Sequence, residues 1–297
     1  MDPPTTALMG EDPGAQASTR TSLRWWKEML YILVIYFVYS LVRNSFGSSG
    51  GGSVVDPVAA FNHAKAVITI QDRLGLYFEP DLQRWYLDLP ARGGIRFWNI
   101  LYGTAHFAVT ATALIWCYRS RPDVYPKWRN TLAFTTLFAL IGFASFSLMP
   151  PRLMDSPGEY GGCQVYAPSA AAAAGEDALT AEGCDRFGFV DTLAVDGGWL
   201  SFGQEGVEDV SNQWAAMPSM HIGWSTWSML VLLGLVRRTW VRALVIAYPF
   251  ITLFCILVTA NHFWLDAIGG LAALGAGYFV SVAVLPRMAR RFAAPIR

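Results

Sequence analysis

The sequence predicts an all-α membrane protein: a bundle of six transmembrane helices with one extra interfacial helix. Composition is the first reason, because 54% of the 297 residues are hydrophobic and only 15% are charged, a balance typical of chains that cross a membrane several times. The second reason is that six segments are apolar enough to cross a hydrocarbon core about 30 Å thick. The third is a repeated pattern of short basic segments between them. The formal net charge is zero, so the charge balance does not indicate a nucleic acid as partner.

Six apolar segments are expected to span the membrane. The first is short but flanked by Trp25 and Trp26, which are suitable anchors for a membrane–water interface. A further segment, 59–76, is amphipathic, and Lys65 and Asp72 within it would be costly in lipid, so an interfacial or re-entrant helix is expected there. The expected spans are 29–42, 97–118, 132–149, 217–236, 243–260 and 262–285.

The spans belong to a single domain, expected over residues 25–290. Residues 1–24 are polar and rich in Pro and Gly, which indicates a disordered cytoplasmic tail, and 291–297 are expected to form a second cytoplasmic tail. The connection at 150–216 is long, and its alanine-rich part at 169–183 is of low complexity.

Basic residues predict how the bundle lies in the membrane. Short loops rich in Lys and Arg face the cytoplasm, and with six spans every basic cluster falls on one side. Both termini are therefore expected in the cytoplasm, with 43–96 and 150–216 outside. The clusters are Arg20, Arg24 and Lys27; Arg119, Arg121, Lys127 and Arg129; Arg237, Arg238 and Arg242; and Arg287, Arg290 and Arg291.

Two of the four cysteines, Cys163 and Cys184, fall in the long outer loop. The outside of a cell is usually oxidising, which favours a disulfide that closes about 20 residues, with two unpaired thiols as the alternative. Cys117 and Cys255 lie within spans and are expected to be packing residues.

Ionisable residues from three distant segments are expected at one membrane level. His262 and Asp266 begin the sixth span, His221 begins the fourth, and Arg152 follows the third, each at the outer end. Taken singly, each has a simpler explanation, such as a hydrogen-bonded interfacial histidine, a helix cap, or an arginine that reaches lipid phosphates. Their combination near a bilayer favours a functional site.

These residue types suit phosphoryl transfer. His262 and Asp266, four residues apart, share one helix face, so the carboxylate can orient the imidazole for attack on phosphorus. His221 can protonate the departing alkoxide. Arg152 offers a cation to the phosphate oxygens, and Ser219 offers a hydroxyl and a helix N-terminus. A zinc site made by the two histidines and the carboxylate has compatible spacing and stays as an alternative.

The motifs resemble those of the type 2 phosphatidic acid phosphatase superfamily, most closely its inositol phosphorylceramide synthase-like (inositolphosphotransferase) branch. They are MPPRLM (149–154), NQWAAMPSMHIGWS (212–225) and ANHFWLDAIGG (260–270), and the similarity extends over about residues 55–285. The resemblance implies a six-helix bundle and a metal-independent reaction through a phosphohistidine. It implies His262 as the nucleophile, Asp266 as its orienting partner and His221 as the general acid.

Two positions depart from the superfamily pattern. Ser145 stands where a lysine is expected, and Ile256 stands where an arginine is expected before His262. In addition, Arg152 is followed by Leu153 and not by proline. A pocket with fewer cations suits a phosphodiester with one negative charge better than a dianionic monoester, which favours the synthase-like branch.

The second expected span carries Asn99, Tyr102 and His106 on one face. A Tyr-x-x-x-His pattern also occurs in the synthase-like branch, which implies contacts with the substrate headgroup. An internal polar network that holds the helices together is an equal alternative.

The sequence therefore predicts an integral membrane enzyme, in the plasma membrane with its active site facing outward, that cleaves a lipid phosphoester through His262. The phosphoryl-headgroup, for example inositol phosphate, then passes to an alcohol acceptor. The alternatives are a lipid phosphatase or pyrophosphatase that uses water, and a non-enzymatic lipid-binding or transport protein. The expected partners are the lipid substrate and an alcohol or lipid acceptor, with no cofactor and no metal. The sequence does not indicate an oligomeric state.

Overall fold

The computed structural model describes residues 24–45, 56–174, 182–196 and 212–293. Helices make up 76% of the structure, and the described residues form no strand, only an isolated bridge between Leu148 and Ala215. The predicted all-α class is confirmed. The tail expected at 1–24 lies outside the described residues except for its last position, as do 294–297 of the second tail and 175–181 of the alanine-rich segment.

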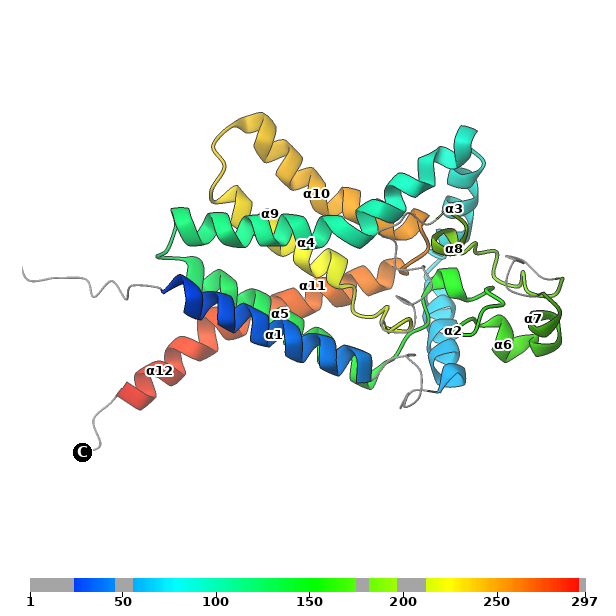
Figure 1. Ribbon diagram of the computed structural model, residues 1–297, viewed down its shortest axis with the longest axis horizontal. Coiled ribbons are helices and arrows are strands. Elements are labelled where there is room, and N and C mark those ends of the chain that lie inside the picture. Colours follow the sequence, from blue (N-terminus) through cyan, green and yellow to red (C-terminus); the bar gives the residue numbers. More distant parts are fainter. Residues whose placement is uncertain (1–23, 46–55, 175–181, 197–211, 294–297) are drawn as a thin grey trace, which may run out of the picture.

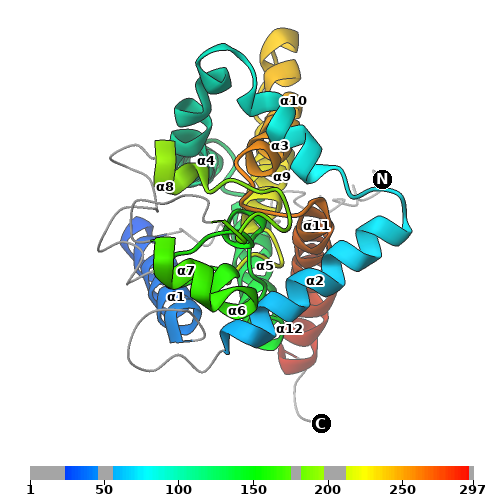
Figure 2. The same ribbon diagram turned by 90° about the vertical axis from the view of Figure 1, so that its right-hand side faces the viewer.

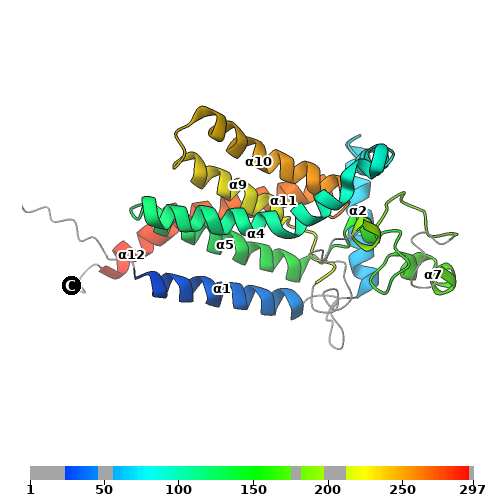
Figure 3. The same cartoon turned by 45° about the horizontal axis from the view of Figure 1, so that its top comes forward.

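The long helices lie side by side along the long axis of the molecule (Figures 1 and 3). They are α1 (Trp25–Ser45), α4 (Ile95–Ser120), α5 (Tyr125–Ser145), α9 (Met220–Leu233), α10 (Thr239–Val258) and α11 (Trp264–Phe279). α11 continues through a π-helical turn (Val280–Val284) into α12 (Leu285–Ala293).

Shorter helices gather at one end of the bundle, which we call the capped end. α2 (Pro57–Arg73) crosses that end transversely, with the other short helices beside it (Figure 2). These are α3 (Glu79–Leu87), α6 (Cys163–Tyr166), α7 (Pro168–Ala174) and α8 (Thr192–Asp196), with 3-10 turns at Pro90–Gly94 and Pro151–Leu153.

The sequence of α2 explains why it forms a cover. Asp56 precedes the helix, and its carboxylate accepts the Val58 N–H at 3.0 Å, which satisfies one of the unpaired donors of the first turn. Phe61 and Ala64 lie on the buried face and pack on the chain at 148–154 that follows α5. The opposite face of α2 is exposed, as its amphipathic pattern predicts.

Within the described residues, four helical segments are long and apolar enough to cross a membrane. They correspond to the first, second, fifth and sixth expected spans, and they suggest an integral membrane protein. The segments are Trp25–Val42, Pro90–Ser120, Thr239–Val258 and Trp264–Met288.

The other two expected spans, 132–149 and 217–236, are not confirmed as membrane-crossing. α5 starts seven residues earlier than expected, at Tyr125, so Lys127 and Arg129 lie in its first turns. α9 has only 14 residues, about 21 Å at a rise of 1.5 Å per residue, which is shorter than the hydrocarbon core. Helix length and composition therefore support four spans, and the six-span arrangement stays a prediction.

α9 is enclosed by its neighbours, because it contacts α4, α5, α10 and α11. Trp227 is fully buried and donates its indole N–H to the Trp128 carbonyl at 2.9 Å. The hydroxyls of Ser228 and Thr110 share a hydrogen bond at 3.2 Å between α9 and α4. A helix this short depends on such packing for its stability, so these contacts hold α9 in place among the surrounding helices.

α9 and α11 approach closely at their starts because Gly270 has no side chain. A Cβ atom at this position would overlap the Ser219 carbonyl oxygen. We expect Gly270→Ala to push the two helices apart and to lower the free energy of unfolding by about 1–3 kcal/mol, measured as a lower Tm in detergent. Gly275→Ala is the control, because nothing lies within 4 Å of a Cβ at that position of the same helix. Equal Tm values for the two variants would contradict this contact.

Cys163 and Cys184 are joined by a disulfide, with Cα atoms 5.4 Å apart. Asp155, nearby in the same loop, accepts the N–H groups of Phe187 and Phe189 at 3.0 and 3.1 Å. Burial raises the pKa of the Asp155 carboxyl, and these hydrogen bonds act in the opposite direction. Together the disulfide and Asp155 tie the described residues 182–196 to the first part of the loop. Cys117 and Cys255 are buried and unbridged.

The basic segments lie at the end of the bundle opposite α2. Figure 1 shows the α4–α5 connection, the α9–α10 connection and α12 at that end. They carry Arg121, Arg237 and Arg287, among others. The start of α11, with His262 just before it, lies at the capped end, so the charged clusters and the candidate site occupy opposite ends of the molecule.

Candidate active site

The chain that leads into α11 makes a strained turn. α10 ends at Val258, and Ala260 has a φ of +51°, a left-handed conformation that residues other than glycine rarely adopt. The Arg152 N–H donates to the Ala260 carbonyl at 2.7 Å, and the His262 N–H donates to the Ile256 carbonyl at 3.3 Å. Backbone strain that the surroundings hold in place is common at functional sites.

His262 and Asp266 form one hydrogen-bonded unit, and both side chains are buried. His262 Nδ1 lies 3.2 Å from Asp266 Oδ2, and the same oxygen accepts the Phe263 N–H at 2.9 Å. Because the carboxylate accepts, Nδ1 carries the proton and Nε2 keeps its lone pair. Nε2 has no hydrogen-bond partner among the described residues. The lone pair is therefore available to a ligand in the cavity that His262 lines.

Glu79 of α3 supports this unit from behind. Its carboxylate is fully buried, accepts the Trp264 N–H at 3.1 Å and is hydrogen-bonded to Gln71 of α2. It thereby satisfies one of the unpaired donors at the start of α11. The sequence reasoning missed Glu79, because an acidic residue in FEPDL looks like an exposed helix start.

His221 lies next to His262 in the cavity, with 5.5 Å between the ring centroids. The Tyr102 ring stacks on His221 at 4.2 Å, and His106 meets His221 edge-on at 4.2 Å. His106 Nδ1 lies 3.0 Å from the Tyr102 carbonyl; because a carbonyl only accepts, Nδ1 is the donor. α4 therefore brings Tyr102 and His106 into contact with His221, as their shared helix face allows.

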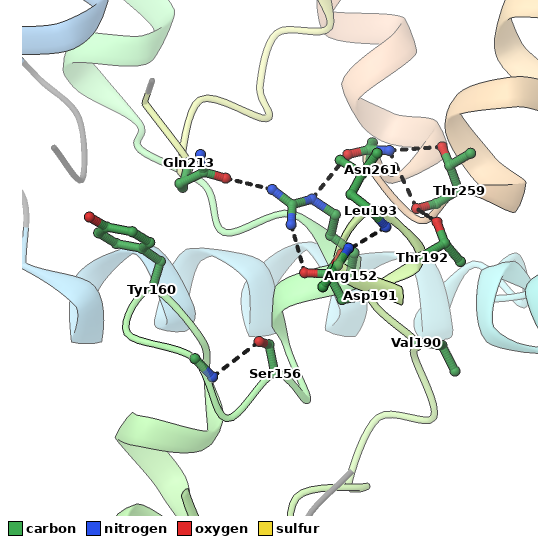
Figure 4. A network of polar contacts seen from close by, with 12 residues as sticks. Arg152, Ser156, Tyr160, Val190, Asp191, Thr192, Leu193, Gln213, Thr259 and Asn261 are labelled. Carbon is green, nitrogen blue, oxygen red and sulfur yellow. Dashed lines mark hydrogen bonds and ion pairs between the residues drawn. The ribbon is translucent and has the colours of Figure 1, made fainter. Parts of the chain in front are cut away.

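Arg152 reaches the same cavity, but its guanidinium is already engaged (Figure 4). Nε donates to Asn261 Oδ1 at 3.1 Å, Nη1 donates to Asp191 Oδ2 at 2.7 Å, and Nη2 donates to Gln213 Oε1. Three of its five N–H donors are thus used within the protein. The sequence predicted a phosphate-binding cation here, and nothing in it indicated the acidic partner.

Ser219 and Asn99 differ from the sequence-based expectation, because neither is among the described residues that line the cavity. The Ser219 N–H donates to the Asp266 carbonyl at 2.9 Å, so this donor of the α9 N-terminus is not available to a phosphate. Asn99 Nδ2 donates to the Thr192 carbonyl at 2.7 Å, and Asn99 Oδ1 accepts the Thr192 hydroxyl at 3.1 Å. Asn99 therefore ties α8 to α4 in an internal polar network, the alternative to headgroup contact.

The cavity is lined by both polar and aromatic side chains. Such a lining suits a ligand with a charged head and an apolar tail. In the described ranges, no group of three or more His, Cys, Asp or Glu side chains is placed to hold a metal ion; Asp266 contacts Nδ1 of His262 and not the side of the ring that carries Nε2. The polar lining residues are His106, Arg152, Asn212, Gln213, His221, Asn261 and His262, and the aromatic and apolar ones include Tyr39, Phe107, Phe143, Met220 and Trp224.

The four apolar helices suggest an integral membrane protein, and its cavity holds a histidine pair at one end of a helical bundle. A family model described as the PAP2 superfamily matches residues 65–280, so the chain belongs to the PAP2 superfamily. The superfamily predicted from the motifs is confirmed, and membership suggests a lipid enzyme of the phosphatase or phosphotransferase type. The match does not distinguish branches within the superfamily. No curated protein and no solved structure matches the chain.

Proposed function

We propose that the protein is a membrane phosphotransferase that cleaves a lipid phosphoester through His262 and passes the phosphoryl-headgroup to an alcohol acceptor, without a metal ion. The observation that carries this proposal is the His262–Asp266 unit. Its Nδ1–Oδ2 distance of 3.2 Å orients the ring, and Nε2 has no partner among the described residues. A histidine oriented in this way, beside a second histidine, has the arrangement of an activated nucleophile with a general acid.

The reaction has two balanced steps. First, His262 Nε2 forms a bond to phosphorus while the bond to the leaving alkoxide breaks, and the alkoxide takes a proton from His221. Asp266 stabilises the positive charge that develops on the His262 ring. Second, the acceptor alcohol gives its proton to His221 and attacks the phosphohistidine, which releases His262 and restores both residues.

The cavity supports a lipid phosphodiester such as an inositol phospholipid as the donor. Arg152 is the one Lys or Arg that lines the cavity in the described part of the chain, and it is paired with Asp191. This low positive charge suits a phosphate with one negative charge. A second, apolar groove between α1, α4, α5 and α9 shares Tyr39 and Trp224 with the cavity, which suits a hydrocarbon chain attached to the reacting headgroup.

The proposal includes an arrangement in the plasma membrane. Six helices cross the bilayer, with α5 and α9 packed against the four apolar segments, both termini in the cytoplasm, α2 at the interface and the site facing outward. Two observations support it. Basic segments lie at the end opposite α2, where the positive-inside tendency expects the cytoplasm. The disulfide lies in the loop at the capped end, which suits an oxidising compartment.

Product analysis tests the proposed reaction. Purified protein in detergent is incubated with phospholipids labelled in the headgroup phosphate, with EDTA present and with or without alcohol acceptors. We expect a new labelled product, the headgroup phosphate joined to the acceptor, only when an acceptor is present. We expect no loss of rate in EDTA. Water-soluble label released without an acceptor would identify a phosphatase. Turnover that EDTA abolishes and zinc restores would contradict the metal-free mechanism, and no turnover on any lipid would leave a binding or transport protein.

A further inference from the structure

We infer that Asp191, acting through Arg152, lowers the positive charge of the phosphate-binding side of the cavity and thereby selects phosphodiesters over phosphomonoesters. The inference rests on the proposed function and names the substrate class that this site takes. Asp191 is not among the described residues that line the cavity, whereas Arg152 is. Asp191 is therefore a positioning and specificity-determining residue, and not a catalytic one.

Asp191 and Arg152 form a buried ion pair. Asp191 Oδ2 accepts Arg152 Nη1 at 2.7 Å, and both side chains are buried, at 8% and 4% exposed. Its Oδ1 accepts the N–H groups of Leu193 and Ala194 at 3.1 and 3.3 Å, at the start of α8. Figure 4 shows Asp191, Gln213 and Asn261 converging on the guanidinium from different segments. The carboxylate is thus fixed by the loop and is not a mobile surface group.

The charge of this pair decides which phosphate is favoured. An unpaired arginine would attract a dianionic monoester more strongly than a monoanionic diester, because the attraction scales with the ligand's charge. A fixed carboxylate behind the arginine opposes that attraction, and opposes it twice as strongly for the dianion. With an effective dielectric constant of about 20, a unit charge about 6 Å from the bound phosphate changes the binding constant of that phosphate by roughly 10- to 100-fold.

Asp191→Asn changes this charge with little change of shape. In that variant the amide oxygen of the new side chain can still accept the Leu193 and Ala194 N–H groups, while its NH₂ group cannot accept from Arg152. The variant therefore removes the negative charge and frees Arg152 Nη1. Asp155→Asn is the matched control, because Asp155 is a buried acid of the same loop that accepts backbone N–H groups and makes no ion pair among the described residues.

The test compares kcat/KM for a diester phospholipid and a phosphatidic-acid-type monoester at pH 8, where the monoester is dianionic because its second pKa is near 6. Inhibition by inorganic phosphate is measured in parallel. We expect Asp191→Asn to raise the monoester-to-diester ratio of kcat/KM by about 10- to 100-fold and to tighten phosphate inhibition, with both quantities unchanged in Asp155→Asn.

Three outcomes would overturn the inference. Equal losses on both substrates in Asp191→Asn, with an unchanged ratio, would assign Asp191 a structural role only. The same ratio change in Asp155→Asn would mean that the total charge of the loop decides selectivity. If the wild-type protein turns over no lipid, the proposed function fails, and calorimetric phosphate binding then tests the inference alone: equal affinity in wild type and Asp191→Asn would overturn it.

Discussion

His262→Ala is expected to reduce turnover of the lipid phosphoester by about 10⁴-fold or more. The substitution removes the atom that bonds to phosphorus, and no other imidazole can replace it without moving, because the His221 ring centroid lies 5.5 Å away. The initial rate with labelled phospholipid in EDTA measures the effect. A rate within tenfold of wild type would contradict the role of His262 as the nucleophile.

His63→Ala is the matched control for this loss. His63 belongs to α2, donates from Nδ1 to the Ser147 carbonyl at 2.8 Å and stacks on Phe146, and it does not line the cavity in the described structure. The chain has four histidines, so this control removes an imidazole while leaving the other three in place. We expect His63→Ala to alter Tm more than it alters the rate, and His262→Ala to do the reverse.

Asp266→Asn is expected to lower kcat by about 10³- to 10⁴-fold, by analogy with the loss of the orienting acid in a catalytic triad. In the wild type Oδ2 accepts both the Phe263 N–H and the His262 Nδ1–H, so an amide oxygen in its place can keep both hydrogen bonds. The variant then keeps the orientation of the ring but loses the negative charge that stabilises the positive charge developing on His262, which slows formation of the phosphohistidine. Steady-state kinetics should show the loss in kcat, with KM changed little.

Glu79→Gln separates this electronic effect from disorder at the start of α11. A glutamine at position 79 can still accept the Trp264 N–H, and Glu79 makes no described contact with the His262 ring. We expect a much smaller loss of kcat than in Asp266→Asn. Equal losses in the two variants would show that Asp266 acts through the position of the helix start, and not through its charge beside His262.

The parts of the site that depend on local spacing could be predicted from the sequence. His262 and Asp266 are one helical turn apart, so their contact follows from helix geometry. His221 could be placed nearby because the apolar segment that it begins starts at the same end of the bundle as the segment that follows His262. The disulfide partners were likewise the two cysteines of one loop.

Partners that come from distant segments could not be predicted. Arg152 is bound by Asp191, 39 residues away, and by Gln213, 61 residues away, and no periodicity connects these positions. Ser219 was assigned to phosphate because helix N-termini have unpaired donors, yet its N–H is satisfied by the Asp266 carbonyl of another helix. Helical periodicity placed Asn99 on a face of α4 without indicating that Thr192 would cover it.

The length of α9 shows that the length of an apolar run in the sequence does not give the length of the helix. The apolar run extends through Leu235 and Val236, but the helix ends at Leu233, before Gly234, and starts only after Pro218 and Ser219. The expected span at 217–236 therefore included apolar residues of the turns on either side, and the helix is shorter than that span. The superfamily, in contrast, could be predicted from the motifs, all of which lie within the matched residues 65–280.

The most direct test of the central claim is mass spectrometry of the protein quenched at alkaline pH during turnover in EDTA. The proposed mechanism predicts a covalent phosphoryl-headgroup adduct on His262, formed with labelled phospholipid, removed on addition of the alcohol acceptor and absent from His262→Ala. An adduct on another residue, or continued turnover in His262→Ala, would contradict the proposal that His262 carries the phosphoryl group.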